Sequence, residues 1–186
     1  MILRIGYKLE DIDFIKAEIK YYFEKVFDVQ VEECEWEAAD LKLAIEKNDT
    51  DLDQIHIELE QGKGIITSNS KVGILIALYR VFHEFGVRYV RPGKEHEVCP
   101  SLTEVDFLEK EIHIEETASF KHRGVCIEGA DSYDNLKNFI DWLPKIGMNS
   151  FFIQFENPYS FFKRWYEHEF NPYAEKEPFS TEIAQE

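Results

Sequence analysis

The sequence is short of cysteine, of basic residues and of long apolar runs, and each shortage excludes a class of protein. Its three cysteines, Cys34, Cys99 and Cys126, form no CxxC pair and leave an odd count, which favours reduced thiols in a cytoplasmic compartment over a disulfide framework. No apolar run is long enough to span a bilayer, and the N-terminus lacks the apolar stretch typical of a signal peptide. We therefore expect a cytoplasmic protein with no membrane partner.

Lysine and arginine are also scarce, at 21 residues against 37 aspartates and glutamates, which gives a net charge of −16. A nucleic-acid surface needs clustered Lys and Arg, and an anionic membrane attracts the same residues. The charge balance therefore excludes both kinds of partner, and we interpret the acidity as a contribution to solubility. Because 44% of the residues are hydrophobic and 15% are aromatic, the chain can bury a sizeable core.

The first part of the chain predicts a small α/β domain. Residues 54–60 alternate apolar and polar side chains before a Gly-rich turn at 61–64, which is the strongest hairpin signal. Apolar residues at helical spacing predict one helix that begins after a cap at Asp11 or Asp13, and a second that begins after the polar stretch 68–70 and ends at Gly86. Further strands are expected at 1–7, 29–35, 40–45, 64–67, 87–90, 105–107 and 111–114. We predict a mostly antiparallel sheet with two helices on one face over residues 1–117.

The pattern changes near residue 118, where we place a domain boundary. The acid excess falls there, and more than half of the aromatic residues follow it. We expect strands at 120–128 and at 149–155, the second of them mostly apolar, on either side of a helix that Asp131 or Ser132 can cap. This βαβ unit cannot cover its own strands, because parallel strands need neighbours on both edges and helices on their faces. We therefore expect residues 118–186 to open a larger parallel β/α structure that is truncated here.

Two stretches resemble parts of glycoside hydrolases. The stretch GKGIITSNSKVGILIALYRVFHEFGVRYVRPG resembles the end of the small α/β domain that precedes the catalytic barrel in several of these enzymes. A second set of residues is similar to the first β/α unit of the barrel in β-hexosaminidase-like (family twenty) enzymes, and the α-glucuronidases share this domain order. That set consists of Phe120, Arg123-Gly124, Ile127-Glu128 and Ile146-Gly147-Met148-Asn149. The resemblance covers roughly residues 54 to 155.

The resemblance implies a TIM-like (β/α)8 barrel with its active site at the carboxyl ends of the strands. In such enzymes the Arg of the Arg-Gly pair binds sugar hydroxyls, and Arg123 occupies that position; a guanidinium suits the role because it offers a rigid fork of donors. Glu128 stands where hexosaminidases usually have Asp and can accept from a sugar hydroxyl. Gln154 stands where they tend to have His, which departs from hexosaminidase specificity. Arg123, Glu128 and Gln154 are thus the predicted substrate-binding residues.

Each of these side chains has a second interpretation. Arg123 either contacts the sugar or pairs with an acid at the barrel mouth. Glu128 is either a ligand or a solvated acid at a strand end, and Gln154 either binds the ligand or satisfies a backbone group. Trp142 and the aromatics of 151–165 either stack on sugar rings or pack in the core, and their spacing favours the core.

No motif supplies catalytic or metal-binding groups. Glycoside cleavage needs two groups that flank the bond, or one acid with substrate assistance, and the resemblance implies that these carboxylates lie on a later barrel strand. Residues 167–169 lack the second His of a zincin helix, so we expect no metal, and we predict no cofactor. His56 and His113 are expected on solvated strand faces, and Cys126 as a small apolar filler inside a buried strand.

Three functional hypotheses are compatible with these observations. The first is the N-terminal fragment of a carbohydrate-active glycoside hydrolase, which is inactive alone and whose parent enzyme binds an oligosaccharide. The second is a non-catalytic module that binds carbohydrate or a partner domain. The third is assembly, because exposed barrel strands invite pairing into a homo-oligomer.

Overall fold

A six-stranded sheet organises the first 118 residues of the computed structural model, which describes residues 1–127, 133–153 and 163–164. The strand order is β2-β1-β3-β5-β4-β8. The strands are β1 (Ile2–Lys8), β2 (Gln30–Glu33), β3 (Leu41–Ile45), β4 (Gln54–Glu60), β5 (Lys63–Ser68) and β8 (Ile112–Thr117). Neighbouring strands are parallel from β2 to β5 and antiparallel from β5 to β8. The fold is therefore mixed α/β, and the prediction of a mostly antiparallel sheet is wrong.

The connections explain the parallel pairs. Strands β1 and β2 are joined by α1 (Asp13–Phe27), and a helical crossover returns the chain to the same direction. In the chain, β4 lies between β3 and β5. Because β4 runs antiparallel to β5, the chain reverses its direction at the β4–β5 hairpin, and β5 then pairs with β3 in parallel. Within the six-stranded sheet, only β4 and β5 are paired through a short turn, and the sequence predicted this hairpin. Its turn residues Gln61 and Gly62 both have positive φ, as a two-residue type I′ turn requires.

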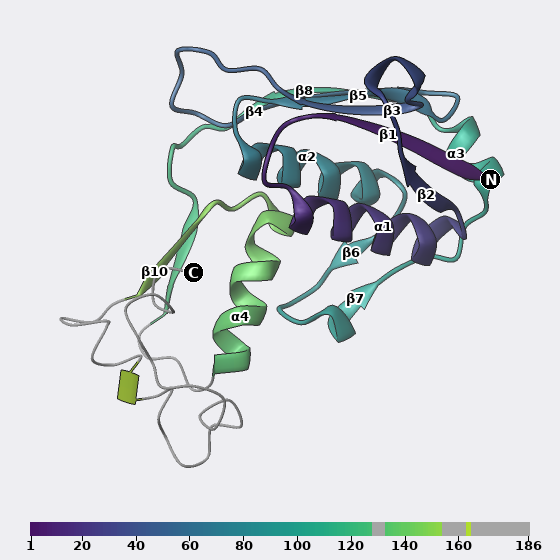
Figure 1. Cartoon of the computed structure of the whole chain (residues 1–186). Helices are drawn as coiled ribbons and strands as arrows, with labels where there is room; N and C mark the ends of the chain where they lie inside the picture. Colours follow the sequence, from purple (N-terminus) through teal and green to yellow (C-terminus); the bar gives the residue numbers. More distant parts are fainter. Residues whose placement is uncertain (128–132, 154–162, 165–186) are drawn as a thin grey trace.

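Two helices cover one face of the sheet, as predicted. Figure 1 shows α1 and α2 (Lys71–Glu84) side by side against the sheet. Ser70 caps α2, because its side chain accepts a hydrogen bond from the Gly73 amide. The expected cap of α1 by Asp11 or Asp13 is wrong, since the cap residue is Ile12 and makes no side-chain hydrogen bond. The turn into α1 is instead set by backbone conformation, with Asp11 at a φ of 51°.

The core lies between the sheet and the two helices. Apolar side chains of β1, β3, β4 and β5 face the helices, and Ile5, Leu43 and Ile57 are fully buried. Aromatic rings in edge-on and tilted contact fill the space around α1 and α2: Tyr22, Phe23, Phe27, Tyr79, Phe82, Phe85 and Phe107. Burying one such side chain stabilises the fold by about 1.5–3 kcal/mol.

Smaller elements surround this layer. The hairpin of β6 (Arg88–Tyr89) and β7 (Glu97–Val98) lies on the side of the helices away from the sheet (Figure 1). Two short 3-10 turns are η1 (Trp36–Ala38) and η2 (Lys94–His96). Residues 105–107, predicted as a strand, belong to the helix α3 (Glu104–Glu109). Thr103 and Asp106 form a capping box there, and its reciprocal hydrogen bonds stabilise the first turn of the helix.

A separate strand–helix–strand unit follows the sheet. It comprises β9 (Gly124–Ile127), α4 (Tyr133–Trp142), the 3-10 turn η3 (Leu143–Ile146) and β10 (Ser150–Ile153), with β9 and β10 parallel. The predicted βαβ unit is thus present, whereas a barrel is not shown. Strand β9 begins four residues later than predicted, and Phe120 is 71% exposed. The expected helix caps Asp131 and Ser132 lie outside the described residues. We call residues 1–118 the sheet unit and residues 119–153 the β9–β10 unit; the domain boundary itself stays a prediction.

Candidate functional site

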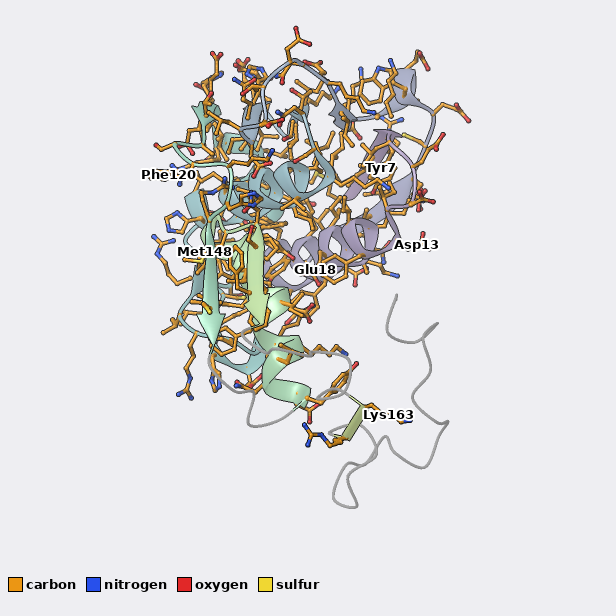
Figure 2. The ribbon with its side chains drawn as sticks, turned by 90° about the vertical axis from the view of Figure 1, so that its left-hand side faces the viewer. Tyr7, Asp13, Glu18, Phe120, Met148 and Lys163 are labelled. Atoms are coloured by element: carbon orange, nitrogen blue, oxygen red, sulfur yellow. The ribbon has the colours of Figure 1, made fainter. Side chains whose placement is uncertain are left out.

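The carboxyl ends of β9 and β10 point away from the six-stranded sheet. In the parallel pair, Gly124 lies opposite Ser150 and Ile127 opposite Ile153. Figure 2 shows the two arrows side by side, with Phe120 near their tails and both heads directed away from the sheet. Binding and catalytic groups of parallel β/α structures gather beyond the carboxyl ends of the strands. A substrate site of this kind would therefore lie on the side remote from the sheet unit.

The three predicted sugar-binding residues divide between the two ends of these strands. Arg123 directly precedes β9 and lies at its amino end. Glu128 follows β9 and Gln154 follows β10, but both residues lie outside the part of the chain that the structure describes. The structure does not bring Arg123 to the carboxyl ends, and the roles of Glu128 and Gln154 stay predictions.

All three nitrogens of the Arg123 guanidinium bind the protein itself. The Nε atom donates to the Gly147 carbonyl at 2.8 Å and Nη1 donates to the Phe120 carbonyl at 2.8 Å. The Nη2 atom donates to Asp53 Oδ2 at 2.7 Å, and the Arg123 and Asp53 side chains are only 19% and 14% exposed. Of the two interpretations of Arg123, this geometry favours pairing with an acid over contact with a sugar.

Asp53 connects the two units of the chain. Its Oδ2 atom accepts hydrogen bonds from Arg123 and from Asn149 Nδ2, both at 2.7 Å, and its Oδ1 atom accepts from Ser70 Oγ at 2.9 Å. Asn149 also accepts from the Arg123 amide at 3.0 Å. We call Asp53, Ser70, Arg123 and Asn149 the Asp53 anchor. It ties the starts of β4 and α2 to the starts of β9 and β10.

The charge of Asp53 is stabilised by its donors. Burial alone would raise the pKa of Asp53, but hydrogen bonds from Arg123, Asn149 and Ser70 outweigh burial and hold the pKa below its ordinary value. A carboxyl whose pKa is lower in the folded than in the unfolded state stabilises the fold above the unfolded pKa, which is about 3.9 for Asp. That contribution is lost as the pH falls through the folded pKa.

We therefore expect a specific pH dependence for Asp53→Asn. Above pH ~5 the wild type should exceed the variant in unfolding free energy by a constant amount, because Asp53 is charged in both the folded and the unfolded state. Below pH ~4 the difference should shrink, because the unfolded wild-type chain takes up a proton at Asp53 that the folded state does not yet bind. Urea unfolding of both proteins between pH 7 and pH 2.5 measures it. A difference that stays constant down to pH 2.5 would show that Asp53 is not held ionised by the anchor.

A second anchor surrounds Lys145, in η3. The Lys145 side chain is 3% exposed, and its Nζ atom donates to Glu97 Oε1 at 2.6 Å and lies 4.0 Å from Glu18 Oε2. Glu97 begins β7, and Glu18 lies on α1 where Figure 2 labels it. Their side chains are 1% and 4% exposed. Lys94 adds a second ammonium on Glu18 Oε1 at 2.6 Å, so the two buried carboxylates face two lysines and the charges balance.

Tyrosine hydroxyls supply further hydrogen bonds to the carboxylates of this anchor. Tyr22 Oη donates to Glu97 Oε1 and Tyr79 Oη donates to Glu18 Oε2, both at 2.7 Å. Burial raises the pKa of both tyrosines far above its ordinary value, and the adjacent glutamates raise it further. Both hydroxyls therefore stay protonated and act as donors. These contacts compensate part of the cost of removing two carboxylates from water.

Three tyrosine rings surround the ammonium group itself. The Lys145 Nζ atom lies 5.7, 5.5 and 5.9 Å from the ring centres of Tyr22, Tyr79 and Tyr89, which is within the range of a cation–π attraction. Tyr89 Oη and Glu97 Oε2 are buried and make no hydrogen bond among the described residues. The Lys145 anchor, which we define as Glu18, Lys94, Glu97, Lys145 and these tyrosines, is therefore sensitive to the loss of any further partner.

Sequence reasoning allowed an acidic partner for Arg123 but did not identify Asp53, and it missed the Lys145 anchor, although one signal for that anchor was available. Glu18 lies three residues after Ile15 and four before Tyr22, which places an acid on the apolar face of the predicted helix. An acid on a buried face requires a buried cation. Lys145 gave no such signal, because a lysine that follows Pro144 and precedes Gly147 by two residues is ordinary for a turn. Its burial depends on how the β9–β10 unit packs against α2.

The other candidates from the sequence have structural explanations. Trp142 Nε1 donates to the Tyr89 carbonyl at 3.0 Å and its ring packs against the core, which confirms the packing interpretation. His113 pairs with Glu58 on the solvated face of the sheet, as expected. Cys126 is exposed, so its prediction as a buried filler is wrong. In the described ranges no three His, Cys, Asp or Glu side chains are placed to hold a metal ion.

Comparison with known proteins does not assign a family. No protein-family model matches the sequence, and no curated protein matches it. Within residues 1–127, 133–153 and 163–164, no helix combines the length and apolar character needed to cross a membrane.

Proposed function

We propose that this chain is the N-terminal part of a carbohydrate-active glycoside hydrolase, in which the sheet unit is a base that fixes the first β/α segment of a catalytic barrel. The observation that carries the proposal is the direction of β9 and β10. Their amino ends are held to the sheet unit by the Asp53 anchor, and their carboxyl ends point away from it. A barrel begun this way would present its substrate end to solvent rather than to the base.

The surface of the β9–β10 unit supports the same proposal. Phe152 on β10 is 51% exposed and Ile140 on α4 is 48% exposed. In doubly covered parallel sheets such side chains are buried by neighbouring strands and helices. Further β/α units that pair with the two strands would cover them.

In this proposal the candidate substrate-binding residues have different roles. Glu128 and Gln154 follow the carboxyl ends of the two strands in sequence, so they are the candidates for sugar contact. Arg123 acts at the opposite end, where it fixes the strand starts to Asp53. The catalytic carboxylates would lie on a later barrel strand, and the 186-residue chain would therefore be inactive alone.

Two measurements test the proposal together. The purified chain should release no 4-nitrophenol from 4-nitrophenyl N-acetyl-β-glucosaminide or from 4-nitrophenyl α-glucuronide. The reading frame beyond Glu186 should continue for roughly 200 residues of alternating strands and helices, and the longer protein should cleave one of the two substrates. Turnover by the short chain, or a longer protein that cleaves neither, would contradict the proposal.

A non-catalytic carbohydrate-binding module is the second candidate, and the exposure of Phe120 favours it. At 71% exposure, this ring is available to stack on a sugar face. Titration of the chain with oligosaccharides of N-acetylglucosamine, followed by NMR, separates the two candidates. Saturable shifts at millimolar concentration or below would support the module, whereas the hydrolase fragment should show none. Pairing of exposed strands into a homo-oligomer stays a prediction, which light scattering can check.

A further inference from the structure

A groove of about 650 Å³ lies between the two units of the chain. Helix α2 forms one wall, the strand β6 forms another, and the turn η3 closes the third side. This volume is in the range of small-molecule sites, which occur preferentially where two units of a protein meet. The groove is separate from the carboxyl ends of β9 and β10, so an occupant here does not depend on the proposed function.

The lining of the groove is mainly apolar. Ile76 of α2 and Ile55 of β4 contribute aliphatic surface, and the buried Tyr79 and Tyr89 lie beside them. At the rim, Val90 is 64% exposed although it belongs to the lining. A surface of this kind gains free energy by excluding water, and it suits the apolar body of a ligand.

Four basic side chains and one acid also line this groove, in a chain whose net charge is −16: Arg80, His83, Arg88, Lys145 and Glu116. Lys145 is already bound to Glu97 Oε1. Arg80 is already paired, with Glu84 Oε1 at 2.6 Å and with Glu116 Oε1 at 3.5 Å. The pKa of His83 is lowered by burial and by the charges of Arg88 and Arg80, which is consistent with a locally positive potential. The groove thus offers an opposite charge to an anion although the protein as a whole is acidic.

Arg88 is the cation that remains available. Its Nη1 atom donates to the carbonyls of His83 and Val87 at 2.8 and 2.9 Å, which fixes the guanidinium against the end of α2. Across residues 1–127, 133–153 and 163–164, Arg88 has no carboxylate partner within salt-bridge distance, and its Nε and Nη2 atoms make no hydrogen bond. A guanidinium held by its own backbone and free along one edge is oriented to bind a carboxylate at two points.

We infer that this groove binds a small organic carboxylate with an aromatic or branched aliphatic body. The carboxylate lies on the free edge of Arg88, and the apolar body lies against Ile76, Tyr89 and Val90. Binding of this ligand requires no movement of the two anchors, which keep α2 and η3 in place on either side of the groove. Charge complementarity at Arg88 distinguishes this occupant from a neutral apolar segment of protein.

The test uses 4-phenylbutyrate as the probe and 4-phenylbutan-1-ol as its neutral counterpart. Each compound is titrated into the full chain, and binding is followed by the NMR shifts of the amides of Ile76, Tyr89 and Gly147. The carboxylate should bind with a Kd below about 1 mM, and the alcohol at least tenfold more weakly. Arg88→Gln should weaken binding of the carboxylate about tenfold and leave the alcohol unaffected.

Arg91→Gln is the matched control, because Arg91 lies three residues further along, is exposed, contacts His96 and does not line the groove. It should leave both affinities unchanged. The inference is overturned if the carboxylate and the alcohol bind equally, if neither shifts these amides at 5 mM, or if the Arg88 variant binds the carboxylate as well as the wild type does. Circular dichroism of both variants verifies that each is folded.

Discussion

Replacing Lys145 by methionine is expected to lower the free energy of unfolding by about 3–5 kcal/mol. The variant removes the only ammonium that contacts Glu97 among the described residues, and leaves this carboxylate 1% exposed with Tyr22 as its remaining donor. Methionine fills nearly the same volume, so the loss reports the uncompensated charge rather than a cavity. Urea unfolding followed by far-ultraviolet circular dichroism measures the change.

Two further variants make the Lys145 prediction specific. Lys137→Met removes an exposed lysine of α4 and should change the unfolding free energy by less than about 0.5 kcal/mol. The double variant Lys145→Met/Glu97→Gln should recover much of the lost stability, because no uncompensated charge then remains at position 97. If Lys145→Met costs no more than Lys137→Met, the buried ion pair does not contribute as described.

Replacing Asp53 by alanine is expected to reduce the free energy of opening of the β9–β10 unit by about 3 kcal/mol. This value is the lower end of the loss expected when one partner of a buried charge pair is removed. Arg123 Nη2 would lose its acceptor, and both Asn149 Nδ2 and Ser70 Oγ would lose a partner at 2.7 and 2.9 Å. Amide hydrogen exchange of β9 and β10 measures this local opening, because it reports the equilibrium between closed and open forms of one segment.

Asp51→Ala is a close control for Asp53→Ala. Asp51 also pairs across the junction, with Lys121 at 2.6 Å, but the two side chains are 77% and 55% exposed. An exposed pair contributes little, so Asp51→Ala should leave the opening free energy of the β9–β10 unit nearly unchanged. Equal effects of the two alanine variants would mean that the Asp53 anchor is no stronger than a surface ion pair.

Local patterns in the sequence predicted local structure well. The β4–β5 hairpin was predicted from alternating residues before a Gly-rich turn, and the structure has that hairpin with positive φ at Gln61 and Gly62. The cap at Ser70 and the left-handed Gly86, with a φ of 93°, also agree with the sequence. In each case the residues that determine the conformation lie within a few positions of one another.

Features that depend on distant segments could not be predicted in the same way. The parallel pairing of Ile5 with Leu41, and of Leu41 with Gly64, depends on the order in which strands enter the sheet, which alternation alone does not encode. Both anchors likewise join residues tens of positions apart, such as Asp53 with Arg123. The helix α3 is different, because the Thr-x-x-Asp pattern of its capping box, Thr103 and Asp106, is local in the sequence, whereas the expected strand at 105–107 was based on a short apolar pattern alone.

The position of Arg123 changes how the resemblance to glycoside hydrolases is interpreted. The sequence suggested a guanidinium that binds sugar, whereas the structure places it at the amino ends of β9 and β10 against Asp53. The substrate end of the proposed barrel is then the opposite end, which Glu128 and Gln154 follow in sequence. Arg123 therefore acts as an anchor between the two units.

A double-mutant cycle across the junction tests that claim most directly. The variants are Asp53→Ala, Arg123→Met and the two combined, and the quantity measured is the opening free energy of the β9–β10 unit from amide hydrogen exchange. If Arg123 is an anchor, the two substitutions should be coupled by about 1–3 kcal/mol, because each removes the same interaction. If the two losses add within about 0.5 kcal/mol, the side chains act independently, and Arg123 does not hold the strand starts through Asp53.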